Sequence, residues 1–197
     1  MSLAVPEGYA EGKCIYSGAR SRIDVAVRES DSREVLLKTY LDTGDPGYAK
    51  VRAEREFGVL RQLSGAGVAE ALELVGLDDQ PVLVLERTPG ISLRAWVGGG
   101  LPDAETFLEV ALQLCEVLVR MHGARLLHRD ISPDNVLVDP TTRGVHLIDF
   151  ELSRPLGAAV HGSGTRLGAT GLVGSLDYVS PEATAHQGKH PVVGIWC

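Results

Sequence analysis

Four polar residues could together handle a phosphate group that is bound to a divalent metal ion. Asp130 and Asn135 lie in one short polar segment, and Asp149 follows the apolar run 145–148. Carboxylate and amide oxygens are ligands that Mg²⁺ accepts readily. Lys38, at the end of another apolar run, adds a positive charge for phosphate oxygens. Phosphoryl transfer depends mainly on positioning and on compensating charge, and these residue types can supply both.

The order and spacing of these residues resemble the signature set of protein kinases. The tripeptide 128–130 reads His-Arg-Asp and is followed by Asn135, as in a kinase catalytic loop, while Asp149 opens a motif similar to Asp-Phe-Gly. The resemblance covers about residues 14–182 and is to the eukaryotic-like serine/threonine kinases of bacteria. It implies that Asp130 accepts the proton of the incoming hydroxyl or orients that hydroxyl, and that Asn135 and Asp149 bind magnesium.

Lys38 ends a run that reads Val-Leu-Leu-Lys, which is similar to the kinase pattern Val-Ala-Ile-Lys. In kinases, a glutamate of the next helix holds this lysine on the phosphates. Glu54 and Glu56 both lie in the segment with helical periodicity. The apolar residues Phe57 and Leu60 place Glu56 closer to the buried side, so Glu56 is the favoured partner.

The resemblance also implies that ATP and Mg²⁺ are the cofactors. The expected nucleotide contacts are Gly18, Ile23, Leu36, Lys38, Leu85, Glu86, Arg87 and Leu137. The apolar members of this set would equally suit an ordinary hydrophobic core. Glu86 and Arg87 are expected to contribute backbone groups only.

The segment 149–182 resembles a kinase activation segment, because it closes with Ser-Pro-Glu where kinases carry Ala-Pro-Glu. Small-molecule phosphotransferases share the Asp, Asn and Asp core but lack this segment. The substrate expected is therefore a serine or threonine of a protein. Arg129 is expected to bind a phosphate in the segment, with Ser163, Thr165 and Thr170 as candidate acceptors.

Some residues depart from the kinase pattern and keep two other interpretations open. Tyr16 and Ser21 replace two glycines of the phosphate-binding loop, Ser132 replaces a lysine of the catalytic loop, and Glu151 replaces the glycine of Asp-Phe-Gly. A pseudokinase that binds nucleotide or a partner without turnover is one alternative. A small-molecule phosphotransferase is the other.

Hydrophobic patterning predicts an α+β chain that resembles the bilobal kinase fold. Five short strands and one helix over residues 49–63 would form a five-stranded antiparallel N-lobe sheet with its helix, followed by an incomplete, mainly helical C-lobe. The expected divisions are an N-terminal extension (1–13), an N-lobe (14–85), a hinge (86–90), a partial C-lobe (91–182) and an atypical tail (183–197).

The strongest helical pattern covers residues 103–122, and Gly123 stands where a helix often ends. Its apolar stripe consists of Phe107, Ala111, Leu114, Leu118 and Met121, and part of this stripe is expected to be exposed if the helices that cover it in a kinase are missing. No second long helical pattern follows residue 182, although a kinase continues there with several helices. The chain is therefore expected to be a C-terminally truncated kinase domain.

Composition excludes several other classes of protein. The chain has 197 residues, of which 44% are hydrophobic, and a net charge of −7, which argues against nucleic acid or an anionic membrane as a partner. No apolar run approaches the roughly 20 residues that span a bilayer. The three cysteines lack metal-ligand spacing, so reduced thiols in the cytoplasm are expected. The resemblance also allows a place within a larger signalling protein.

Overall fold

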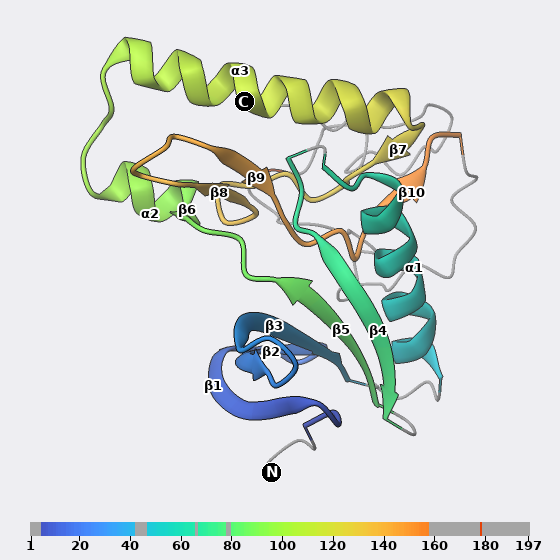
Figure 1. Cartoon of the computed structure of the whole chain (residues 1–197). Helices are drawn as coiled ribbons and strands as arrows, with labels where there is room; N and C mark the ends of the chain where they lie inside the picture. The colour runs from blue at the N-terminus through green and yellow to red at the C-terminus, as the bar shows by residue number, and fades with distance from the viewer. Residues whose placement is uncertain (1–4, 42–46, 66, 78–79, 158–177, 179–197) are drawn as a thin grey trace. The chain divides into compact units, whose positions relative to one another are not determined.

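The computed structural model describes residues 5–41, 47–65, 67–77, 80–157 and 178 (Figure 1). The chain forms two compact units. The first comprises Met1–Gly65 and Ala69–Thr88, and the second comprises Ala66–Val68 and Pro89–Cys197. Each unit has its own secondary structure and is described separately.

The first unit contains a five-stranded antiparallel sheet, as the sequence predicted. Its strands are β1 (Tyr9–Ser17), β2 (Ser21–Arg28), β3 (Arg33–Tyr40), β4 (Ala71–Leu77) and β5 (Gln80–Glu86). Their spatial order is β1-β2-β3-β5-β4. β1 begins five residues earlier than the strand expected at Cys14, because its polar first half pairs with the end of β2.

The two faces of this sheet have different roles. One face carries a buried apolar cluster made of Tyr9, Ala26, Val35, Leu37, Val82 and Val84. Because side chains alternate along a strand, Leu36, Lys38 and Tyr40 of β3 point to the other face. That face is covered by the helix α1 (Tyr48–Gln62), which packs on β3, β4 and β5 (Figure 1).

The buried side of α1 agrees with the expected one at Glu56 and Leu60. Val51, although apolar, is 46% exposed. The buried residues are Ala49, Arg52, Ala53, Glu56, Val59 and Leu60. Two charged residues thus lie on the inner side of the helix, and the small residues Ala49 and Ala53 leave room for them.

Among its described residues, the second unit has two helices and five short strands that pair in two groups. Its helices are α2 (Leu93–Gly98) and α3 (Ala104–Gly123), and its strands are β6 (Ile91–Ser92), β7 (Leu126–Leu127), β8 (Val136–Val138), β9 (Val145–Leu147) and β10 (Arg154–Pro155). The strand groups are β6-β8-β9 and β10-β7. The β8–β9 hairpin was predicted, whereas α2 and the two-residue strands are too short to show a period.

α3 begins and ends for identifiable reasons. The Asp103 side chain caps its first turn by accepting a hydrogen bond from the Thr106 backbone N–H at 2.8 Å. Gly123 is the last residue of the helix, as expected, but it does not take a positive φ itself. Arg125 instead takes a left-handed conformation, with φ of 58°. The buried residues are Val110, Val117, Leu118 and Met121.

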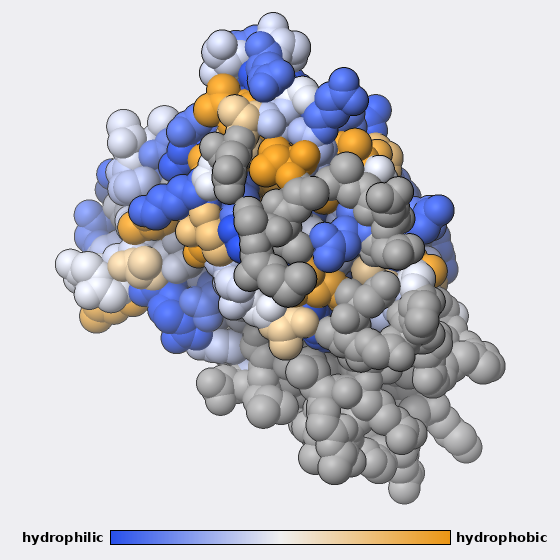
Figure 2. All heavy atoms as spheres, turned by 90° about the horizontal axis from the view of Figure 1, so that it is seen from below, coloured by the Kyte–Doolittle hydropathy of each residue, from blue (hydrophilic) through white to orange (hydrophobic). Residues whose placement is uncertain are grey.

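One side of α3 exposes apolar residues. Phe107, which belongs to the predicted apolar stripe, is 58% exposed, in line with the expectation that part of the stripe is exposed, and Leu108, Leu112 and Val119 are exposed to a similar or greater extent. In the first unit, the exposed apolar side chains are those of Ile15, Tyr16, Val27 and Val51. On the face drawn in Figure 2, hydrophobic residues form separate groups among hydrophilic ones. In the described part of the chain, no helix combines the length and apolarity that crossing a bilayer requires.

Gly90 fixes the backbone immediately before β6. Its φ is 124°, a value that side-chain-bearing residues rarely adopt. A Cβ at this position would also lie 2.9 Å from the carbonyl carbon and oxygen of Val138. Glycine thus allows the chain to approach β8 closely, just before β6 pairs with it.

Candidate active site

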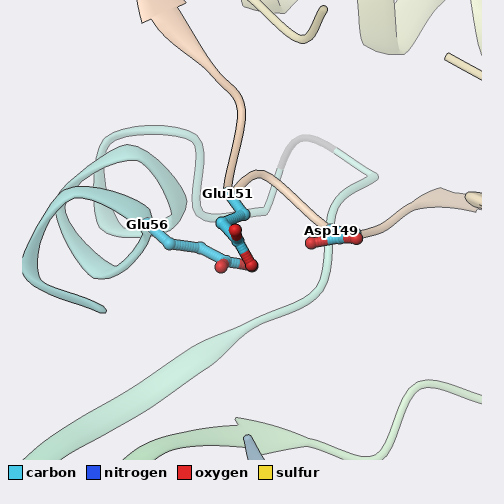
Figure 3. Close-up of side chains that lie close together, drawn as sticks. All are labelled: Glu56, Asp149 and Glu151. Atoms are coloured by element: carbon cyan, nitrogen blue, oxygen red, sulfur yellow. The ribbon is translucent and has the colours of Figure 1, made fainter. Parts of the chain in front are cut away.

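Lys38 and Glu56 form a buried ion pair in the first unit. The Lys38 Nζ atom donates to both carboxylate oxygens of Glu56, at 3.0 and 2.7 Å. The two side chains are only 4% and 1% exposed. Glu54, the other candidate, lies on the outer side of α1, where its closest approach to Lys50 is 4.0 Å. The structure therefore brings Lys38 to Glu56, on the helix drawn in Figure 3.

Two residues that the sequence analysis missed complete this cluster. The Tyr40 hydroxyl donates a hydrogen bond to Glu56, and Tyr40 is fully buried. Arg52 is 1% exposed, and its guanidinium lies 5.3 Å from the centre of the Tyr40 ring. The signal that could have found them is positional: Tyr40 shares the strand face of Lys38, and Arg52 lies one helical turn before Glu56.

The apolar nucleotide contacts expected in the first unit share one face of the sheet. Ile23 lies directly opposite Lys38 on the neighbouring strand, and Leu36 lies opposite Leu85. Directly paired residues point to the same side of a sheet, so these side chains surround Lys38. Leu85 is buried, while Ile23 and Leu36 are half-buried.

The remaining predicted contacts of this unit lie at its turns and at its last strand. The Gly18 N–H donates to the Ser21 carbonyl at 2.9 Å, which closes the turn between β1 and β2. The backbone N–H of Glu86 donates to the Glu70 carbonyl at 2.9 Å. The Arg87 side chain forms an exposed ion pair with Glu34.

The second unit contains Asp130 and Asn135, which are held together by hydrogen bonds. The Asn135 side-chain nitrogen donates to the backbone carbonyl of Asp130 at 2.8 Å and to its carboxylate at 3.0 Å. These bonds use the nitrogen of the amide, so the amide oxygen retains its lone pairs as a ligand. The Ile148 N–H donates to the Asn135 carbonyl at 2.9 Å, which brings Asn135 next to the residue before Asp149.

His128 supports this loop as a neutral ring. Its Nδ1 atom accepts from the Asp130 N–H at 3.3 Å, and its Nε2 atom lies 3.1 Å from the Ile148 carbonyl. This pattern requires a proton on Nε2 and none on Nδ1. Burial lowers the pKa of His128, which agrees with the neutral form. Phe150, fully buried, packs edge-on against the ring with a centroid distance of 4.6 Å.

Asp149 and Glu151 lie on either side of Phe150 in the loop after β9 (Figure 3). Carboxylate oxygens of the two residues come within 4.8 Å of each other. Asp149 is exposed and has a φ of 62°, in the left-handed region. Two carboxylates this close repel each other unless a cation or a donor lies between them. Their oxygen atoms are hard ligands and their charge is negative, and both properties suit Mg²⁺.

The backbone of Arg129 also lies in the left-handed region, with φ of 71°. Its guanidinium is partly buried, and the loss of water lowers its pKa. Left-handed conformations of residues other than glycine, asparagine or aspartate are uncommon and cluster at functional sites. The strained residue Arg129 thus lies directly before Asp130, whereas Asp149 is of a residue type that tolerates the left-handed conformation.

Ser132 and Leu137 lie in the same part of the second unit. Ser132 is 3% exposed, and its hydroxyl has no hydrogen-bond partner among the residues that the structure describes. Leu137, the nucleotide contact expected in this unit, is half-buried in β8, where it pairs with His146 and Ser92.

An ion pair that the sequence analysis did not identify joins α2 to the catalytic loop. The Arg94 Nε atom donates to both oxygens of Asp134, at 2.8 and 2.9 Å, and its backbone N–H donates to the Pro133 carbonyl at 3.1 Å. Hydrogen bonds to Asp134 and to Tyr178 raise the pKa of Arg94. Forty positions separate Arg94 from Asp134, so no local pattern indicates the contact. The candidate acceptors Ser163, Thr165 and Thr170, and the segment 180–182, lie outside the described residues.

Comparison with known proteins agrees with this arrangement. The family model described as "Protein kinase domain" matches residues 9–197. The chain is 30% identical to serine/threonine-protein kinase cds1 of Schizosaccharomyces pombe, over 80% of this chain and 32% of that protein. It is 32% identical to the probable serine/threonine-protein kinase PkwA of Thermomonospora curvata, over 80% of this chain and 20% of that protein.

A third relative is serine/threonine-protein kinase AfsK of Streptomyces coelicolor, which is 34% identical over 79% of this chain and 19% of that protein. The chain thus spans about a third or less of the length of these relatives. The family match nevertheless covers nearly all of the chain, and it includes the Lys38–Glu56 pair and the Asp130, Asn135 and Asp149 set. The chain belongs to the protein kinase family, as a domain of the serine/threonine type.

Proposed function

We propose that the chain transfers the γ-phosphate of ATP to serine or threonine hydroxyls of a protein, with Mg²⁺ as the metal. The observation that carries this proposal is the joined arrangement of Asp130, Asn135 and Asp149 at one end of the β8–β9 hairpin. A base for the hydroxyl and two hard oxygen ligands are thereby held by one small piece of backbone. That set is what kinase-type phosphoryl transfer requires.

Each residue has a distinct role in this proposal. The Asp130 carboxylate accepts or orients the substrate hydroxyl, and the Asn135 amide keeps that carboxylate in place through its nitrogen. The amide oxygen of Asn135 and the Asp149 carboxylate would hold Mg²⁺, which neutralises phosphate charge when bound. The donor set supports this assignment, since hard oxygen ligands from few residues suit this ion.

Lys38 is the proposed phosphate clamp. Glu56 fixes its Nζ atom with two hydrogen bonds, so the ammonium group is oriented in advance. A preorganised charge of this kind stabilises developing negative charge without a cost for reorganisation during the reaction. The adenine ring is proposed to contact Ile23, Leu36, Leu85 and the backbone of Glu86 and Arg87, and Gly18 is the proposed backbone contact to the phosphates. Leu137 is the adenine contact proposed from the second unit.

Arg129 is the proposed site for a regulatory phosphate. It is a partly buried cation at a strained position of the catalytic loop. A phosphate on a nearby hydroxyl would form charge-assisted hydrogen bonds with it. The much greater length of the curated relatives supports a place for this domain within a larger signalling protein.

The test is transfer of labelled γ-phosphate from ATP and Mg²⁺ to a generic basic protein. Asp130→Asn should abolish transfer, while Asp134→Asn, an exposed carboxylate of the same loop, is the matched control and should retain most of it. Nucleotide binding by the parent chain without any transfer would support the pseudokinase alternative. Transfer to an aminoglycoside but not to protein would support a small-molecule phosphotransferase.

A further inference from the structure

Tyr40 and Arg52 surround the Lys38–Glu56 pair with contacts of their own. The Tyr40 hydroxyl donates to Glu56, so this carboxylate receives hydrogen bonds from two side chains. The ring of Tyr40 also lies 5.3 Å from the Lys38 Nζ atom and 5.3 Å from the Arg52 guanidinium carbon. Both distances are within the range of cation–π attraction.

Arg52 ties α1 to two other segments of the first unit. Its guanidinium donates to the Leu41 carbonyl at 3.1 Å and to the Arg20 carbonyl at 2.9 Å. The Leu41 N–H donates to the same Arg20 carbonyl at 2.8 Å. The helix, the end of β3 and the chain after the Gly18 turn are therefore joined through one buried cation.

The burial of these groups determines how α1 can move. Tyr40, Arg52 and Glu56 are each at most 1% exposed. A buried charge or hydroxyl that loses its partner keeps the full cost of desolvation. Displacing α1 from β3 would break the bonds of Arg52 and Tyr40 together with those of Lys38. The helix is thus held by one cooperative network and not by a single ion pair.

We propose that Tyr40 and Arg52 are positioning residues that hold Glu56 on Lys38 before nucleotide binds, so that the lysine clamp is preformed within the first unit. The inference rests on the proposed function, because it assigns these residues to the phosphate clamp. It further means that the helix needs no external signal to bring Glu56 to Lys38. Any regulation of the domain would then act on other segments.

Hydrogen exchange of the whole chain tests the inference without relying on catalysis. In the parent chain, the amides of residues 49–62 should be protected without nucleotide, and Mg²⁺-ATP should change their exchange rates less than about twofold. Tyr40→Phe keeps the ring but removes the hydroxyl. It should raise exchange in α1 about tenfold or more, since a hydrogen bond to a charged group is lost. Protection that appears in the parent only after ATP is added would overturn the proposal.

Arg52→Met, with Lys50→Met on the exposed side of α1 as its control, gives a second comparison. Arg52→Met should accelerate exchange in α1, and Lys50→Met should not. Arg52→Lys keeps the charge but cannot reach both carbonyls, so its exchange should be intermediate. Equal exchange in all three variants and the parent would contradict the proposed role of Arg52, even if Tyr40→Phe fails to fold.

Kinetics separates positioning from general damage to the fold. In Tyr40→Phe, a smaller fraction of the molecules has Glu56 on Lys38, and ATP binds to that fraction. The apparent affinity for ATP is therefore reduced in proportion to the fraction. KM for ATP should therefore rise while kcat at saturating ATP is largely retained, and Mg²⁺-ATP should restore protection of α1. A fall in kcat with KM unchanged would contradict the inference. If the parent transfers no phosphate but shows the expected exchange, the proposed function fails and the preformed cluster stands.

Discussion

The two units prepare their charged residues in opposite ways. In the first, the network of Lys38, Glu56, Tyr40 and Arg52 is almost fully buried, and its charges are satisfied by one another and by backbone carbonyls. In the second, Asp149 is exposed, and the carboxylate of Glu151 lies close to its own. The first cluster pairs buried opposite charges, whereas the second brings two carboxylates together at a site that includes an exposed one.

The difference indicates how each cluster should respond when a phosphate group or a metal ion binds. A preformed lysine clamp needs little reorganisation when phosphate arrives. The Asp149 and Glu151 carboxylates, in contrast, lie close together, and a metal ion bound by them would reduce their mutual repulsion. Substituting Asp149 should therefore affect metal-dependent binding of ATP. Substituting Lys38 should affect both the rate of phosphoryl transfer and the stability of the first unit.

Asp149→Ala should have the largest effect and abolish measurable phosphoryl transfer. It removes a full carboxylate charge from the proposed metal site, so the loss in metal-supported ATP affinity should exceed the about 10–100-fold typical of outer-shell changes. Asn135→Ala should be milder because an amide dipole is lost. Calorimetry with and without Mg²⁺ measures both. Equal ATP affinities of Asp149→Ala and the parent in Mg²⁺ would exclude Asp149 as a ligand.

Lys38→Met should reduce the rate of transfer by about 10²–10³, the usual cost of losing one preorganised group. It should also destabilise the first unit by up to about 3–5 kcal/mol, because Glu56 remains buried without its ammonium partner. Adding Glu56→Leu should recover stability but not activity. Denaturant unfolding and initial rates test the two parts separately, and unchanged rates in Lys38→Met would refute the clamp.

His128 should make stability depend on pH. Burial holds its folded pKa below the ordinary value of 6.5, so the unfolded chain takes up the proton first as the pH falls. Its contribution to stability should be complete above pH 6.5 and should decrease as the pH falls toward the folded pKa. Urea unfolding between pH 8 and 5 would measure this. Over the acid part of that range, His128→Asn should lose less stability than the parent. An identical loss in both proteins would contradict the role given to His128.

Ser132→Ala should have the smallest effect. Removing a buried hydroxyl that has no partner in the described structure eliminates an unsatisfied group, so stability should stay within about 1 kcal/mol or rise. Urea unfolding at constant pH gives the comparison. Ser132→Lys tests the same position differently: a charge near the reacting phosphate should preserve or raise turnover. A destabilised Ser132→Ala would show that the hydroxyl has a partner.

The sequence predicted the parts that depend on local pattern. The sheet, α1, α3 and the β8–β9 hairpin follow from apolar periodicity and turn residues, and the kinase family follows from the spacing of Asp130, Asn135 and Asp149. The preference for Glu56 over Glu54 depended on two apolar neighbours. Leu60 was the informative neighbour, because it lies four residues after Glu56, and a helix places residues four apart on one face.

Contacts between distant or unlike residues could not be predicted in this way. Arg52 and Tyr40 were missed because the sequence does not distinguish a buried arginine or tyrosine from an exposed one. The carbonyls of Arg20 and Leu41 that bind Arg52 are backbone groups, which no residue type indicates. Arg94 was missed because Asp134 lies far along the chain. Which residues of the apolar stripe of α3 are exposed could not be predicted either: Phe107 is 58% exposed, whereas Leu118 and Met121 are buried.

Gly90 has a consequence for mutational tolerance. Its φ of 124° disfavours every other amino acid, and so does the 2.9 Å distance at which a Cβ atom would meet the Val138 carbonyl. Gly98, by comparison, has open space around it and no positive φ. In a library that samples all amino acids at each codon, position 90 should be depleted of every replacement, including alanine, while position 98 accepts many. The absence of a side chain at position 90 thus limits which variants of this sequence can fold.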